Sequence, residues 1–129
     1  MLKKDINRLA DNLQCFIDLS LFDSNTGESF SKDCLDKDAR KQVTACEKAL
    51  ALILGKKDTI SEMSFAECAE ILKGLQKDFS AHVRELRDFW KKDTSLIVME
   101  EGQAKAFGEA AKLCEAYQPE KIKETVERD

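Results

Sequence analysis

The 129-residue chain contains only one histidine, one proline and one tryptophan, and five glycines. One histidine excludes the His-Glu-x-x-His zinc motif and the paired Glu-x-x-His motifs of di-iron bundles, because each needs more than one imidazole. No glycine-rich loop of a kind that holds phosphate is present. We therefore expect no metal, no cofactor and no catalytic residues, and predict that the protein is not an enzyme.

Long apolar runs are also missing. The longest runs from Ala49 to Leu54, far short of the ~20 residues that a membrane-spanning helix needs. The first ten residues have no apolar core of the kind found in secretory signals. The five cysteines are odd in number, and no two lie within five residues of each other, which favours reduced thiols over disulfides or a zinc knuckle. These features predict a cytoplasmic protein that does not enter a membrane.

Charge is plentiful but mixed, with 21 basic and 25 acidic residues and a net charge of -4. Basic residues recur along one segment, at Lys73, Lys77, Arg84, Arg87 and Lys91. Acidic residues interleave with them, which is typical of a solvated, ion-paired helix face. Phosphate binding needs clustered cations, so we expect no nucleic-acid partner.

Apolar residues spaced by three and four predict helices in most of the chain. The expected segments are residues 2–22 and 31–54, a third helix that Ser64 caps, a fourth that begins at 93–95 and ends near Tyr117, and a short fifth from Pro119. Residues 23–29 are expected to form a loop, and no strand is predicted. The pattern predicts an all-α fold, with residues 1–129 as one domain: an antiparallel four-helix bundle with a short C-terminal fifth helix.

The third helix has the most regular stripe, which comprises Phe65, Cys68, Leu72, Leu75, Phe79, His82, Leu86 and Phe89. Because His82 lies on this stripe, we expect it to be buried and hydrogen-bonded to a neighbouring helix. A phosphotransfer histidine or a pH-sensitive contact are alternatives. Cys46, Cys68 and Cys114 also lie on inward stripes. They could meet His82 in a zinc site, but buried cysteines more often pack as small hydrophobes.

The helices have more apolar surface than one bundle needs to bury. Trp90 follows Phe89 and points about 100° away from it, so it should not form one site with His82. The four residues from Leu96 to Met99 cannot all face inward on a helix. Small residues every fourth position, including Gly102 and Ala106, indicate close approach by another helix or a local irregularity. The predicted interface therefore comprises Phe89, Trp90, Leu96, Met99, Gly102 and Ala106.

From these patterns we predict a non-enzymatic protein–protein interaction module, such as an adaptor, a chaperone-like protein or a regulatory or neutralising protein. It would bind another protein, or a second copy as a homodimer, through an apolar helix face. One alternative is a small-ligand carrier or sensor with a cavity between helices near Phe79, His82 and Phe107. Another is an enzyme with scattered acidic catalytic residues.

Overall fold

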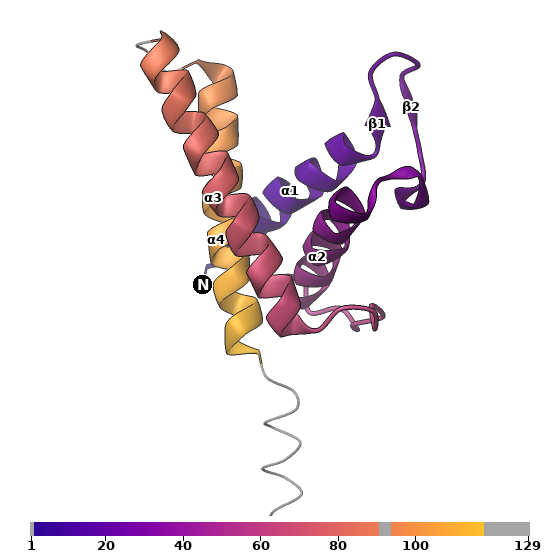
Figure 1. Cartoon of the computed structure of the whole chain (residues 1–129). Coiled ribbons are helices and arrows are strands. Elements are labelled where there is room, and N and C mark those ends of the chain that lie inside the picture. Colours follow the sequence, from indigo (N-terminus) through magenta and orange to yellow (C-terminus); the bar gives the residue numbers. More distant parts are fainter. Residues whose placement is uncertain (1, 91–93, 118–129) are drawn as a thin grey trace, which may run out of the picture.

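The computed structural model describes residues 2–90 and 94–117, and most of them are helical (Figure 1). The elements are helix α1 (Lys3–Ser20), strands β1 (Phe22–Asp23) and β2 (Glu28–Ser29), the 3-10 turn η1 (Lys32–Cys34), and helices α2 (Lys37–Ile53), α3 (Phe65–Trp90) and α4 (Ser95–Ala116). The all-α prediction is confirmed. The predicted fifth helix, from Pro119, lies outside the described residues.

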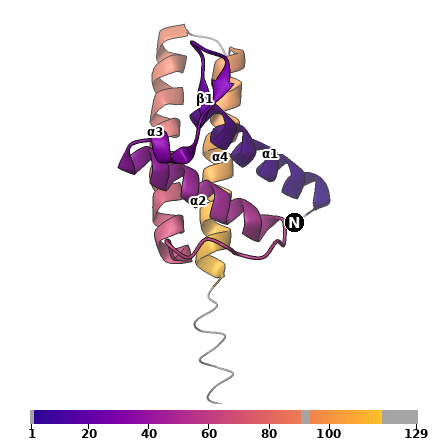
Figure 2. The ribbon, with the colours of Figure 1, turned by 90° about the vertical axis from the view of Figure 1, so that its right-hand side faces the viewer.

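The helices form two helical hairpins. The pair α3 and α4 shares the most extensive contact, and α1 and α2 pack on each other and on that pair. In Figure 1 the α1–α2 hairpin leaves the α3–α4 hairpin at an angle, so that the two hairpins together form a V. Figure 2 shows the same arrangement from the side. The predicted antiparallel four-helix bundle is therefore not confirmed.

The two hairpins differ in length. Helices α3 and α4 have 26 and 22 residues, whereas α1 and α2 have 18 and 17. At ~1.5 Å per residue, α3 extends about 39 Å and α2 about 26 Å. The shorter hairpin therefore cannot cover the full length of the longer one. The end of α3 and the start of α4 project beyond it as a two-helix arm (Figure 1).

Three phenylalanine rings meet where the two hairpins join, at a contact that we call the phenylalanine junction. The ring of Phe107 in α4 lies 5.2 Å from that of Phe16 in α1 and 5.0 Å from that of Phe79 in α3, centre to centre and edge to face. Phe16 and Phe79 complete the triangle at 6.0 Å. Phe107 is fully buried. Edge-to-face pairs are favourable beyond the area they bury, so this contact fastens α1 to the long hairpin.

Small residues allow α3 and α4 to lie close together. Ala104, Ala110 and Ala111 are all buried. A Cβ atom on Gly108 would overlap the side-chain amide of Gln76 in α3. The predicted close approach by another helix is thus made within the chain at this position, between α3 and α4.

Two expectations near the N-terminal half are wrong. The helix predicted over 31–54 is interrupted, because Leu35 has an extended backbone. Helix α2 begins at Lys37, and Asp36 caps it by accepting a hydrogen bond from the Ala39 amide at 2.8 Å. The loop predicted over 23–29 contains part of a small hairpin, in which Phe22 pairs with Ser29 and Asp23 with Glu28. Two-residue strands are too short for an alternating pattern to reveal them.

A buried lysine fixes the connection between α2 and α3. The Lys48 side chain is only 3% exposed, and its Nζ donates to Asp58 Oδ2 and to the Ile60 carbonyl, each at 2.7 Å. The same ammonium lies 4.3 Å from the centre of the Phe65 ring. Burial raises the pKa of the Asp58 carboxyl, but hydrogen bonds from Lys48 and the Ile60 amide outweigh this effect and hold the pKa below its ordinary value.

The Lys48–Asp58 pair gives a prediction about how stability depends on pH. Asp58→Asn should lower the free energy of unfolding by about 1–3 kcal/mol near neutral pH, because it leaves the Lys48 charge buried without its counterion. Since the folded pKa of Asp58 is depressed, its contribution is present above the ordinary pKa and is lost as pH falls through the lower folded value. Urea unfolding at several pH values should show the difference between the proteins shrinking below about pH 4.

The control is Lys48→Met, which removes the buried charge and leaves Asp58 partly solvated. It should cost less than Asp58→Asn. An equal or larger loss in Lys48→Met, or a difference between Asp58→Asn and wild type that does not change with pH, would contradict this account.

Candidate functional site

The apolar stripe of α3 extends beyond the core that covers it. Leu72 and Leu75 near its start are buried, and Phe79 and Leu86 are half-buried. Phe89, in the last turn, is 75% exposed. The stripe is continuous in sequence, but α1 and α2 pack on it only as far as the phenylalanine junction. The far end of the stripe is therefore available to another molecule.

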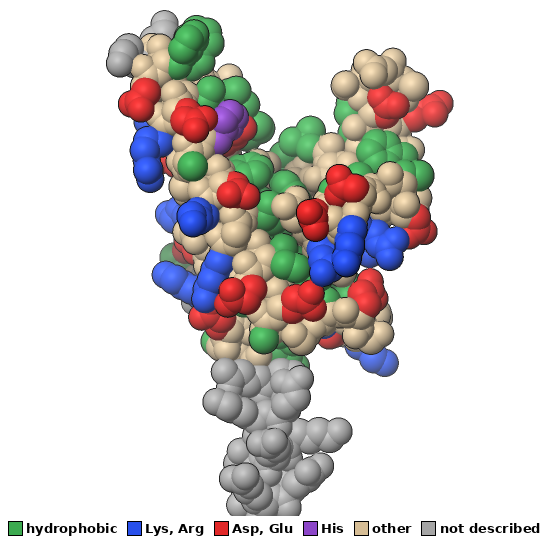
Figure 3. All heavy atoms as spheres, in the orientation of Figure 1, with side chains coloured by type: hydrophobic (Ala, Val, Ile, Leu, Met, Phe, Trp, Pro, Cys, Tyr) green, Lys and Arg blue, Asp and Glu red, His purple; other side chains and the backbone are tan. Residues whose placement is uncertain are grey.

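The free end of the long hairpin gathers exposed apolar side chains from both helices. We call this set the tip patch; it comprises Phe89, Trp90, Leu96, Val98 and Met99. Trp90 is 51% exposed, and its ring lies edge to face with that of Phe89 at 5.1 Å. Figure 3 shows apolar side chains at this free end of the arm. Adjacent exposed apolar residues of this size are typical of an interaction surface.

The six residues predicted for the interface do not all lie together. Phe89, Trp90, Leu96 and Met99 belong to the tip patch. Gly102 and Ala106 instead border a groove between α4 and α1, with Leu9 and Asn12 on its other side. A Cβ atom on Gly102 would lie 3.8 Å from Asn12 Oδ1, and Ala106 is buried. These two small residues therefore pack within the chain. Val98 was not among the six, although the apolar run that contains it was the available signal.

Among the described residues, a hydrogen bond between His82 and Glu100 and an ion pair between Arg87 and Glu101 join α3 to α4 within the projecting arm. His82 Nδ1 lies 2.5 Å from Glu100 Oε2, and Arg87 pairs with Glu101. The predicted hydrogen bond from His82 to a neighbouring helix is present. Its predicted burial is wrong: the side chain is 50% exposed, because neither α1 nor α2 reaches this part of the stripe. The partners of His82 and Trp90 differ, so the two do not share a site.

Gln103 lies between the arm and the junction. It is 3% exposed, and among the described residues its Nε2 atom has no hydrogen-bond partner. A buried amide without a partner costs about 1–3 kcal/mol. Sequence reasoning missed this residue, because one glutamine among apolar neighbours carries no periodic signal.

Three of the five cysteines meet in the core. Cys46, Cys68 and Cys114 are buried in one cluster at the covered end of the long hairpin, whereas Cys15 is half-buried and Cys34 exposed. His82 lies on the projecting arm and takes no part. Within residues 2–90 and 94–117, no group of three His, Cys, Asp or Glu side chains is placed to hold a metal ion.

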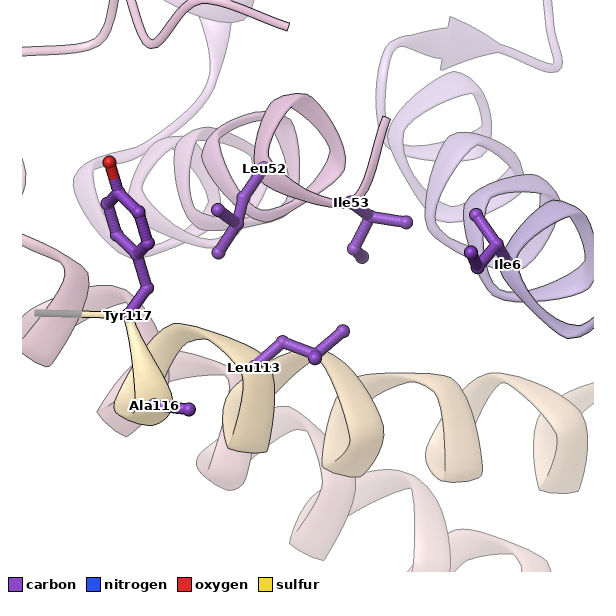
Figure 4. A pocket seen from close by; sticks show the side chains of 6 residues that line it. All are labelled: Ile6, Leu52, Ile53, Leu113, Ala116 and Tyr117. Atoms are coloured by element: carbon purple, nitrogen blue, oxygen red, sulfur yellow. The ribbon is translucent and has the colours of Figure 1, made fainter. Parts of the chain in front are cut away.

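An apolar groove of about 350 Å³ lies at the end of the molecule opposite the tip patch. Its lining comes from the start of α1 and the ends of α2 and α4, and comprises Ile6, Leu52, Ile53, Leu113, Ala116 and Tyr117 (Figure 4). This groove is not at the place near Phe79, His82 and Phe107 where the sequence predicted a cavity. The rings of Phe79 and Phe107 are in contact there, 5.0 Å apart centre to centre.

Comparisons of the chain with protein-family models, with curated proteins and with solved structures give no match. Among the helices that the structure describes, none combines the length and apolar character needed to cross a membrane. Any function must therefore be argued from the tip patch, the groove and the buried side chains.

The hydrogen bond between His82 and Glu100 gives a second prediction. His82→Leu should lower the free energy of unfolding by about 1 kcal/mol, because the Glu100 side chain, which is only 15% exposed, loses this partner. Urea unfolding followed by circular dichroism provides the measurement, with Arg87→Leu as a matched variant on the neighbouring pair. A loss above about 2 kcal/mol in His82→Leu alone would mean that the imidazole has a structural role beyond this pair.

The buried amide of Gln103 gives a third prediction. Gln103→Met keeps nearly the same shape and removes the polar group, so it should raise the free energy of unfolding by about 1 kcal/mol. Thermal unfolding measures the change, and Gln14→Met, at an exposed position of α1, is the control. A loss of stability in Gln103→Met would show that the amide is hydrogen-bonded in solution.

Proposed function

We propose that the chain is a non-enzymatic interaction module that binds another protein through the tip patch. The observation that carries this proposal is the projecting arm, which presents five large apolar side chains from two helices. Trp and Phe are frequent at the centres of protein interfaces. The patch lies at the end of paired helices, so binding requires little backbone ordering.

The size of the patch supports a modest affinity. Complete burial of one such side chain contributes roughly 1.5–3 kcal/mol, and these side chains are already partly covered. Five of them give a gross gain of the order of the ~8 kcal/mol that a micromolar complex needs, before the cost of association is subtracted. We therefore infer a transient contact of micromolar or weaker affinity.

The shape and charge of the arm favour an apolar helical partner. Two antiparallel helices leave a shallow furrow between them, and an amphipathic helix fits such a furrow with residues spaced by three and four. Among the described residues of this part of α3, the basic side chains Arg84 and Arg87 interleave with the acidic side chains Glu85 and Asp88. Interleaved charges of this kind do not favour a strongly basic or acidic ligand. We do not propose nucleic acid as the partner.

A homodimer is the second form of the same proposal, since two arms packed together would complete four helices. The free thiols favour a reducing compartment such as the cytoplasm. Adaptor, chaperone-like and regulatory or neutralising roles are all compatible with such a surface.

A second candidate function is the binding of a small apolar molecule in the groove of Figure 4, which is lined by aliphatic side chains and the Tyr117 ring. Its location separates it from the first proposal. Substitutions in the tip patch should leave such a ligand's affinity unchanged.

The fourth prediction tests the tip patch. A double variant, Phe89→Ser with Trp90→Ser, should weaken partner binding at least about tenfold, because hot-spot aromatics each contribute about 2 kcal/mol or more. A tagged chain would first isolate the partner from the host, and calorimetry with the purified partner would then give dissociation constants. Sedimentation of the chain alone would reveal a homodimer by its doubled mass.

The control is Leu19→Ser, which changes a residue that is also more than half exposed but lies at the end of α1. It should bind as wild type does, and circular dichroism should confirm that both variants fold. Equal binding by the tip variant and wild type, with no self-association of either, would refute the proposal.

A further inference from the structure

Two buried thiols touch at the covered end of the long hairpin. Cys68 lies in the first turn of α3 and Cys114 in the last turn of α4, and their Sγ atoms are 3.6 Å apart. Both residues are almost fully inaccessible. The Cys68 thiol is also 3.1 Å from the Ala45 carbonyl of α2. The two sulfurs are thus held side by side by three helices.

We propose that Cys68 and Cys114 form a redox-active dithiol that a small hydroperoxide oxidises to a disulfide. The sulfurs need to approach by only about 1.5 Å to reach the bonded distance of ~2.05 Å. Burial selects the reagent, because a molecule the size of hydrogen peroxide can enter where glutathione or a protein disulfide cannot. This inference is independent of the tip patch.

The environment makes the two thiols unequal. A hydrogen bond from Cys68 lowers the pKa of Cys114; burial opposes this, and the Lys48 ammonium adds to the lowering. The same hydrogen bond, together with burial, raises the pKa of Cys68. The thiolate is the reactive form of cysteine. The Cys68 thiol also donates to the Ala45 carbonyl at 3.1 Å, which keeps it protonated. We therefore assign Cys114 as the attacking sulfur and Cys68 as the thiol that resolves the intermediate.

The chemistry balances with hydrogen peroxide as the only added reagent. The Cys114 thiolate attacks one peroxide oxygen, the O–O bond breaks, and the leaving hydroxide takes up the proton released by Cys114 to form water. The resulting sulfenic acid is attacked by the Cys68 sulfur. The S–O bond breaks, and its hydroxyl leaves with the Cys68 proton as a second water. Two thiols lose two electrons in total, and one peroxide is reduced to two waters.

The disulfide would join the two ends of the long hairpin. Cys68 and Cys114 are separated by 46 positions, and the rings of Phe65 and Tyr117 already meet nearby at 4.7 Å. Cys46 lies in the same buried cluster, but burial raises its pKa strongly. We therefore expect Cys46 to remain a thiol.

The test treats the full chain with hydrogen peroxide under native conditions and then blocks the remaining thiols after denaturation. Peptide mapping should find one cross-link, between Cys68 and Cys114, and intact mass should show the loss of two hydrogen atoms for it. In Cys68→Ala the reaction should stop at a Cys114 sulfenic acid, which dimedone added together with the denaturant traps. Cys46→Ala is the matched control and should still form the disulfide.

Exposed Cys34 reports whether the oxidant acted. The proposal is overturned if Cys34 is oxidised while Cys68 and Cys114 remain thiols, or if their cross-link appears only in denaturant. It is also overturned if oxidised glutathione cross-links them as readily as peroxide does. The wild-type map decides the matter even where a variant fails to fold.

Discussion

The contact of Phe16, Phe79 and Phe107 is the constraint on which the rest of the structure depends. It fixes the point at which the short hairpin leaves the long one. On one side of it, four helices share a core; on the other, within the described residues, α3 and α4 pack on each other alone (Figure 1). The angle between the two hairpins determines exposure, because α1 and α2 diverge from α3 and α4 and do not lie along the projecting arm (Figure 1). The tip patch is exposed for this reason.

The covered end depends on a different interaction, the buried ammonium of Lys48. Its two hydrogen bonds hold the connection between α2 and α3 and so place the first turn of α3. The same charge lies near enough to the paired thiols to affect the pKa of Cys114. A burial that is costly by itself therefore serves both the fold and the chemistry proposed for this end. The two ends of the long hairpin carry different proposals, one for association and one for oxidation.

Several local features could be predicted from the sequence because they depend on neighbouring residues. Ser64 accepts a hydrogen bond from the Glu67 amide at 3.1 Å and so caps α3, as predicted. Gly55, which follows α2, has a positive φ of 69°, as is common after the end of a helix. The helix predicted over 31–54 includes Leu35, whose backbone is extended. A periodic pattern does not detect a single residue with an extended backbone.

By itself the sequence determined that the chain is helical, which face of each helix is apolar, and that Trp90 and His82 point in different directions. Helical periodicity contains that information, since it depends on 100° per residue. Only the tertiary structure decided what covers each face. His82 continues the stripe of Leu75 and Phe79 yet is half exposed, and Ala106 is buried against α1, because cover depends on where another helix ends. Likewise, the sequence placed Cys68 and Cys114 on inward faces, but only the packing of α3 on α4 brought their sulfurs within 3.6 Å.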